Sequence, residues 1–107
     1  MDLENMDHEQ FSDEQQQQML FMMLVQQHQQ IAMMGLGKVK NPSTDKIERD
    51  LKSAKFAIDT LLMLRDFTEG NLPDKLGNYL EQTLSTLQLN YADEQESSDQ
   101  ENQEQKE

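Results

Sequence analysis

Apolar side chains recur at helical intervals through the middle of this chain, and this periodicity constrains the fold more than any other feature. Between residues 47 and 61 the spacings are four, three, four and three. The positions are Ile47, Leu51, Ala54, Ile58 and Leu61. Such spacing gathers the side chains on one face of an α-helix. Because no segment alternates in the manner of a strand, the sequence predicts an all-α fold.

Local end signals divide the chain into three predicted helices, near residues 13–34, 44–68 and 73–91. Ser12 and Gln15 have the spacing of a capping box, which marks the start of the first helix. Nothing after them breaks a helix until Gly35 and Gly37, which are typical of a helix end. The first helix is therefore predicted to have both of its ends defined locally.

The second and third helices have signals of the same kind. Ser43 or Thr44 is predicted to cap the second helix, and Gly70 to end it. Pro73 suits the first position of the third helix, where its missing N–H costs nothing. Gly77 weakens that helix, and we interpret it as the site of a close helix contact.

The net charge of −12 is confined to the two ends of the chain. Residues 1–15 and residues 93–107 each carry a net charge of −6, and the residues between them are neutral in sum. Both ends have few apolar side chains, so burial there cannot offset the entropy cost of ordering. We therefore predict disordered acidic termini around one domain, with a disordered segment at residues 1–12, a helical domain at 13–91 and a disordered tail at 92–107.

Several classes of function are disfavoured by composition. Acidic ends repel phosphate backbones, so no nucleic-acid partner is expected. The longest apolar run, Met19–Val25, is far shorter than the roughly 20 residues that cross a bilayer, so no membrane partner is expected. The first fifteen residues contain no Lys or Arg, unlike a secretory signal, which favours a cytoplasmic protein.

No arrangement of residue types indicates a catalytic, cofactor or metal site. The chain has no cysteine, and His28 has no second ligand three or four residues away. The eight methionines are embedded among apolar residues, as in a core or an adaptable interface. Asp59 is the one carboxylate that keeps an enzymatic interpretation open, because it adjoins the apolar Ile58. The prediction is that the protein is not an enzyme and binds no cofactor.

The first helix carries a wider apolar surface than one core-facing stripe needs. Its candidate interface residues are Phe21, Met22, Leu24, Val25 and Ile31. Because a core this small is marginal alone, we expect a three-helix open assembly or bundle that is completed by homo-oligomerisation. The expected partner is thus a second copy of the chain, with another protein as the alternative.

A set of short motifs resembles a family of small bacterial proteins known as domain of unknown function 1844. The motif residues are Gly37, Asn41, Pro42, Asp59, Gly70, Asn71 and Leu72. The resemblance covers about residues 19–91, and Gly-Asn-Leu is its most specific part. Lys40 and Pro73 depart from the family pattern, and the second departure shifts the expected helix cap toward Asn71. The resemblance implies a bacterial, cytoplasmic helical protein and supplies no activity.

Three classes of function therefore remain open. The favoured one is a non-catalytic interaction, structural or regulatory module that binds protein through the surface of residues 21–25 or the loop of residues 35–44. The alternative is a binding module for an apolar or acyl small molecule held between helices in a Met-lined pocket. The third is an enzyme with an unfamiliar site around Asp59.

Overall fold

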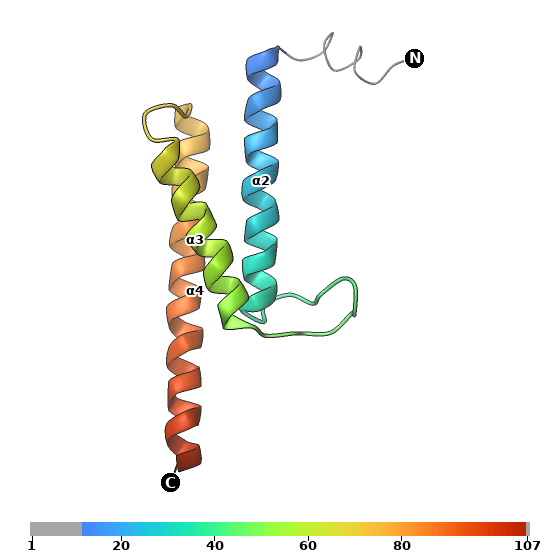
Figure 1. The fold of residues 1–107 in the computed structure, drawn as a ribbon, viewed down its shortest axis with the longest axis vertical. Helices are drawn as coiled ribbons and strands as arrows, with labels where there is room; N and C mark the ends of the chain where they lie inside the picture. The colour runs from blue at the N-terminus through green and yellow to red at the C-terminus, as the bar shows by residue number, and fades with distance from the viewer. Residues whose placement is uncertain (1–11, 107) are drawn as a thin grey trace.

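The fold is a bundle of three helices, as a computed structural model shows for residues 12–106 (Figure 1). Side-chain surroundings are described as far as residue 99. Within the described residues the helices are α2 (Asp13–Gly35), α3 (Leu51–Phe67) and α4 (Asp74–Lys106), and no strand is present. The prediction of an all-α, three-helix fold is confirmed. Helix α3 runs antiparallel to α2 and α4, as the ribbon shows.

Helix α2 begins and ends where its local signals predict. The Ser12 hydroxyl accepts a hydrogen bond from the Gln15 N–H at 3.1 Å, and the Gln15 side chain accepts one from the Ser12 N–H at 3.1 Å. This reciprocal pair is a capping box. At the other end Gly37 has a φ of 76°, and the N–H groups of Gly37 and Lys38 donate to carbonyls of the last turn. The rest of the predicted segment at residues 1–12 lies outside the described residues.

Helix α3 begins at Leu51, so the predicted start near residue 44 with Ser43 or Thr44 as the cap is wrong. The cap is Asp50, whose carboxylate accepts from the N–H groups of residues 52 and 53 at 3.2 and 3.3 Å. A hydrogen bond from the Ser53 hydroxyl, at 2.8 Å, acts with these backbone bonds to lower the pKa of Asp50. The Asp50 N–H also donates to the carbonyl of Gly35 at 2.8 Å, which fixes the start of α3 against the end of α2.

The loop between α2 and α3 is organised by Asn41. Its Oδ1 accepts from the Ser43 N–H at 2.9 Å, and its Nδ2 donates to the Glu48 carboxylate at 2.9 Å. Its backbone N–H donates to the Lys46 carbonyl at 2.8 Å, within an isolated antiparallel bridge. Because these bonds hold the backbone out of a helix, Ile47 lies in the loop with 53% of its surface exposed, not on the predicted helix face.

Helix α4 begins at Asp74, directly after Pro73, and extends to Lys106. The periodicity predicts instead an end near residue 91 and a disordered tail beyond it. The additional segment contains no Gly or Pro and is rich in Gln and Glu, which are good helix formers. Its first turn is also fastened to the preceding loop by hydrogen bonds between Arg49 and Glu94. Propensity and this long-range contact together account for the longer helix.

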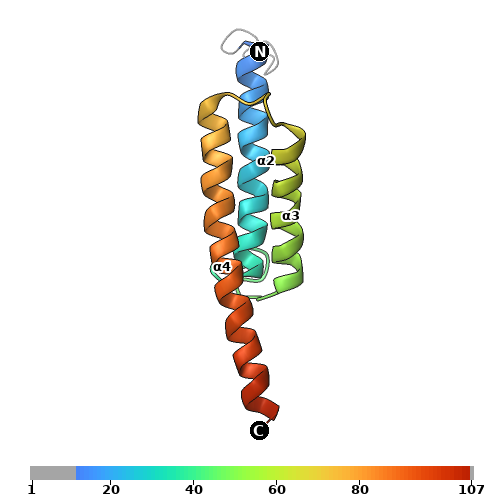
Figure 2. The same ribbon diagram turned by 90° about the vertical axis from the view of Figure 1, so that its left-hand side faces the viewer.

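The hydrophobic core lies where the three helices meet, and α2 is flanked by α4 on one side and α3 on the other (Figure 2). The core cluster consists of Val25, Ala32, Leu36, Ala54, Ala57, Ile58, Leu61, Leu80, Leu84 and Leu87. Helix α3 contributes two alanines, which let the backbones approach closely. At the end of α2, a Cβ added to Gly35 would lie 2.7 Å from the Asp50 carbonyl oxygen and 2.8 Å from the Ala54 nitrogen. This position therefore requires glycine.

Replacing Gly35 with alanine will lower the free energy of unfolding by about 1–3 kcal/mol, because the methyl group would press against backbone atoms. Gly77→Ala is the matched control: among the described residues nothing lies within 4 Å of a Cβ added there. The expected close helix contact at Gly77 is thus wrong, and alanine should raise the stability by up to about 1 kcal/mol. Urea denaturation measures both changes, and the packing argument fails if the two variants shift in the same direction.

Candidate functional site

The residues that carry the family resemblance are spread along the bundle and do not form one site. The loop between α2 and α3 holds Gly37, Asn41 and Pro42 at one end (Figure 1). The turn between α3 and α4 holds residues 70–72 at the other end, and Asp59 lies within α3. Gly37 ends α2 and Asn41 shapes the loop, so these two residues serve the fold.

The turn between α3 and α4 is built by the most specific of the family-like motifs. Gly70 has a φ of 79°, a conformation that favours glycine. The Asn71 N–H donates to the Thr68 carbonyl at 2.9 Å, and the Thr68 hydroxyl donates to the Leu64 carbonyl at 2.6 Å. Leu72 is half-buried against the core. The motif therefore reverses the chain and anchors the turn.

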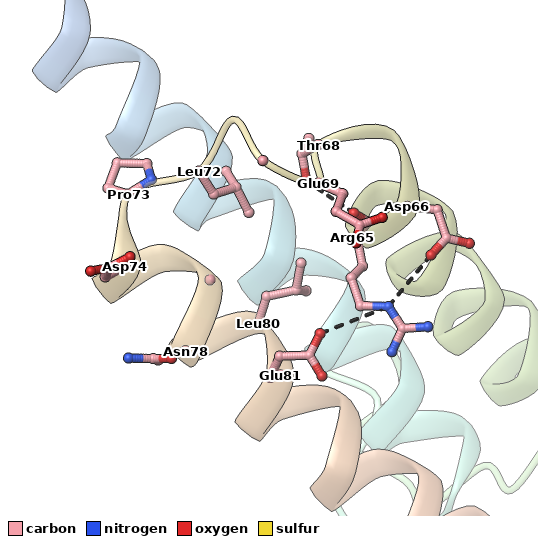
Figure 3. A pocket seen from close by; sticks show the side chains of 12 residues that line it. Arg65, Asp66, Thr68, Glu69, Leu72, Pro73, Asp74, Asn78, Leu80 and Glu81 are labelled. Carbon is pink, nitrogen blue, oxygen red and sulfur yellow. Dashed lines mark hydrogen bonds and ion pairs between the residues drawn. The ribbon is translucent and has the colours of Figure 1, made fainter.

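This corner also encloses a hollow of about 470 Å³ between the end of α3 and the start of α4 (Figure 3). Arg65 reaches across it, with its Nε 3.5 Å from the Asp66 carboxylate and 3.8 Å from the Glu81 carboxylate. Glu69 and Asp74 also line the hollow, so acids outnumber the single base. The surplus of negative charge disfavours a phosphate or another anion as its occupant.

Asp59, the carboxylate that the sequence singles out, lies in a surface ion pair. The Lys55 Nζ lies 2.7 Å from its Oδ2 at i,i+4 spacing, and the two side chains are 61% and 52% exposed. This hydrogen bond raises the pKa of Lys55. The His28 Nδ1 bonds the Leu24 carbonyl within its own helix, at 2.9 Å. Among the described residues, no group of three or more His, Cys, Asp or Glu side chains is placed to hold a metal ion.

A long-range cluster that sequence analysis missed joins the loop to α4. The Arg49 Nε donates to the Glu94 carboxylate at 2.9 Å, while its Nη2 donates to the Glu94 carbonyl at 2.8 Å and to the Ser98 hydroxyl. The Lys38 Nζ lies 3.5 Å from the same carboxylate. The Arg49 hydrogen bond lowers the pKa of Glu94, and the positive charge of Lys38 adds to this effect. No local spacing reveals a pair of residues so distant in sequence.

The predicted interface of α2 is divided between the core and the surface. Val25 is fully buried, and Phe21 packs half-buried against the core. Met22, Leu24 and Ile31 are exposed, by 39%, 36% and 41% of their surfaces. A helix that is apolar on most sides does not reveal which side meets its own bundle. For Val25 and Phe21 the assignment to an outward surface is therefore corrected.

Helix α3 exposes a second set of apolar side chains that the sequence analysis leaves without a role. Phe56 is 76% exposed, Met63 is 41% exposed and Phe67 is 83% exposed. Their spacing of seven and then four residues places all three on one stripe of the helix. That spacing is the sequence signal that identifies the stripe, on the face opposite the core periodicity.

The exposed stripes of α2 and α3 lie on the same face of the bundle. Ile31 of α2 lines a hollow together with Ser53, which is three residues before Phe56 on α3. The opposite flank of α3 faces α4, because Leu62 lines a hollow with Tyr91. The stripe of α3 is therefore turned away from α4 and lies at the surface on the same side of the bundle as Ile31. We define the α2–α3 face as Leu20, Leu24, Ile31, Phe56, Met63 and Phe67.

Comparison with known protein families places most of the helical scaffold in one family. The family model of a domain of unknown function, DUF1844, matches residues 18–93. The chain belongs to the DUF1844 family. The resemblance indicated by the motifs is thus confirmed, whereas no curated protein and no solved structure shows a significant match. Within the part of the chain that the structure describes, no helix is both long and apolar enough to cross a membrane.

The DUF1844 segment coincides with the packed part of the molecule. It contains the whole α2–α3 face and every residue of the core cluster in the described structure. It ends one residue before Glu94, so the acidic extension of α4 lies outside it. The family match therefore describes the helical scaffold and its exposed apolar face, not the charged end of the chain.

Arg49→Gln will loosen the extension of α4, because it removes the donor that holds Glu94 to the loop. Amide hydrogen exchange at residues 92–98 should become faster while exchange in the core is unchanged. Lys46→Gln is the control, since it removes the same charge from the same loop without touching Glu94. Equal effects of the two substitutions would show that only net charge matters.

The same contact gives α4 a pH dependence of known sign. The pKa of Glu94 lies below its ordinary value of 4.5 in the folded protein, so the folded state binds fewer protons there. The stabilisation is therefore complete above that ordinary value and is lost as the pH falls through the lowered pKa. Protection of residues 92–98 should drop as the pH falls below about 4.5, and it should drop less in Arg49→Gln. Unchanged protection over this range would contradict the assignment.

Proposed function

We propose that this DUF1844 protein is a non-catalytic protein–protein interaction module and that the α2–α3 face is its docking surface. The observation that carries the proposal is the exposure of Phe56 and Phe67, at 76% and 83%, on the same face as exposed apolar residues of α2. Isolated apolar residues at a surface are ordinary, whereas a continuous group of them marks an interaction site.

The size of this group supports the proposal. The two phenylalanines expose on the order of 300 Å², given about 200 Å² for a phenylalanine side chain. With the four aliphatic and methionine side chains the exposed apolar area reaches roughly 600 Å², the upper end for the largest patch on a typical monomer. Interface centres are also enriched in Phe and Met and depleted in charge. The α2–α3 face has that composition.

The shifted pKa values also favour a structural role for the polar residues. Among the described residues, the pKa departs from its ordinary value at Asp50, Lys55 and Glu94. The first is a helix cap, and the other two belong to surface ion pairs. Catalytic acids and bases are tuned within clefts. All three shifts are explained by the fold without invoking a reaction.

A hollow of about 560 Å³ between α2 and the start of α4 supports a second candidate function, the binding of an apolar or acyl small molecule. Its walls include Met19, Met22, Pro73 and Leu76, and Lys75 also lines it. The volume and the apolar lining suit a ligand of modest size. The lysine ammonium offers a partner for a carboxylate at the end of an acyl chain.

Phe56→Glu combined with Phe67→Glu will weaken partner binding at least about 30-fold, because it places two charges on the apolar docking surface. Both side chains are mostly exposed, so the helical circular dichroism should be retained. The measurement is chemical crosslinking in the producing cells, followed by mass spectrometry of the proteins joined to this chain.

Leu89→Glu is the matched control for this experiment. Leu89 is 65% exposed and lies on α4, away from the α2–α3 face. It introduces the same change of side chain at comparable exposure and should leave the crosslinked partners unchanged. If the double variant keeps its partners, or if Leu89→Glu loses them equally, the α2–α3 face is not the docking surface.

The second candidate function has its own test. Native mass spectrometry of protein purified without denaturant should show a bound small molecule if the hollow is a ligand site. Met22→Lys places a charge in the apolar wall and should remove that molecule, whereas Leu89→Glu should retain it. A spectrum that contains only the polypeptide mass before and after substitution would exclude this function.

A further inference from the structure

We infer that the occupant of the α2–α3 face is a second copy of the same chain, docked about a two-fold axis. This inference rests on the proposed function, because it requires the α2–α3 face to be a docking surface. It adds the identity of the partner and the direction in which the partner lies.

The charge distribution favours a second copy over a different partner. A two-fold interface brings a surface patch against its own copy, so any net charge on that patch would repel itself. From Gln15 to Gly37 the chain contains no Asp, Glu, Lys or Arg, although its net charge is −12. Lys52, Lys55, Asp59 and Asp66 border the stripe of α3, and their charges sum to zero. The face is thus neutral in a strongly acidic protein, as self-association requires.

The exposed area is also what a dimer needs. A standard interface buries about 800 Å² per partner, and homodimer interfaces are about 65% apolar. The expected apolar contribution is therefore roughly 500 Å² per copy, close to the roughly 600 Å² that the six side chains expose. The α2–α3 face of each copy therefore supplies enough apolar area for the interface, and no other surface is needed.

A two-fold axis perpendicular to the helices matches the spacing along the stripe of α3. Phe56 and Phe67 are separated by three turns, about 16 Å, and an antiparallel partner brings Phe67 of one copy to Phe56 of the other. Thr60 lies between them, near the axis. Its hydroxyl already donates to the Phe56 carbonyl at 2.8 Å, so burial leaves no donor without a partner.

This arrangement also explains the composition of α2 and the placement of the acidic end. Helix α2 would be covered by its own α3 and α4 on one side and by the second copy on the other, as an uncharged, broadly apolar helix requires. The α2–α3 face is turned away from α4, so the two α4 helices would lie on the outer sides of the dimer. Their acidic extensions would then be kept apart.

Sedimentation velocity of the full chain at about 100 µM should give a dimer for the wild type and a monomer for the Phe56→Glu, Phe67→Glu double variant. Leu89→Glu should remain a dimer, and circular dichroism verifies that each variant is folded. Because the chain has no cysteine, Thr60→Cys adds a single thiol near the axis, whereas Ser85→Cys adds one on α4. Mild oxidation should produce a disulfide-linked dimer from Thr60→Cys and none from Ser85→Cys.

The results separate this inference from the proposed function. A wild-type monomer at this concentration overturns the inference, and so does a dimer that survives the double variant. If the wild type is monomeric while crosslinking in cells captures a different protein that depends on Phe56 and Phe67, the docking surface stands and only the identity of the partner is wrong. If neither experiment depends on the two phenylalanines, both proposals fall.

Discussion

The structure depends on the burial of one helix, α2, whose apolar surface is larger than its two neighbours can cover. Val25 and Ala32 point into the core and are fully buried, and α3 and α4 close over that side. Leu20, Leu24 and Ile31 lie outside this contact and remain exposed. Helix α2 carries no charged residue after Glu14, so glutamines such as Gln27 and Gln30 are the side chains that solvate its uncovered side. These exposed apolar side chains of α2 are the reason for proposing a further contact on this side of the bundle.

The close contact at Gly35 determines which side chains of α3 lie beside the uncovered side of α2. The Gly35 carbonyl accepts the Asp50 N–H at 2.8 Å, and the absence of a Cβ lets the α3 backbone approach α2. Asp50 in turn caps α3, so one residue fixes both the start of α3 and its register against α2. From that register follows the position of Phe56 and Phe67 beside the exposed stripe of α2. A local backbone contact at one end of the bundle therefore sets the composition of a face that runs along its length.

The parts of the fold that were predictable from sequence are those determined by residues close together in the chain. The capping box of Ser12 and Gln15 and the end of α2 at Gly35, followed by the positive φ of Gly37, are local, and both are where the sequence predicts them. The start of α3 depends on a contact between Asp50 and Gly35, and the extension of α4 is supported by Arg49. Neither contact is visible in local spacing, so the spacing alone does not predict the start of α3 at Leu51 or the end of α4 at Lys106.

The candidate site was predictable to a lesser extent, and for a different reason. The periodicity of α3 identifies its core face, from Ala54 to Leu61, and does not by itself indicate a role for the outer residues. On α2 the apolar residues are too numerous to indicate a direction, so Val25 was assigned outward although it is fully buried. Only packing against a second helix shows which apolar residues are left over. The exposed apolar surface consists of the apolar residues that the core does not bury, so its composition depends on how the helices pack.

The positions of the family-like residues show which parts of the DUF1844 segment build the fold. Its recognisable residues, Gly37, Asn41 and Gly70 among them, build turns at opposite ends of the bundle and bring no reactive groups together. The described structure presents an apolar face without charged residues within the matched residues 18–93. The acidic extension of α4 lies outside that segment and is held to it by Arg49. The packed helices thus carry the exposed apolar surface, and the extension of α4 carries the excess negative charge.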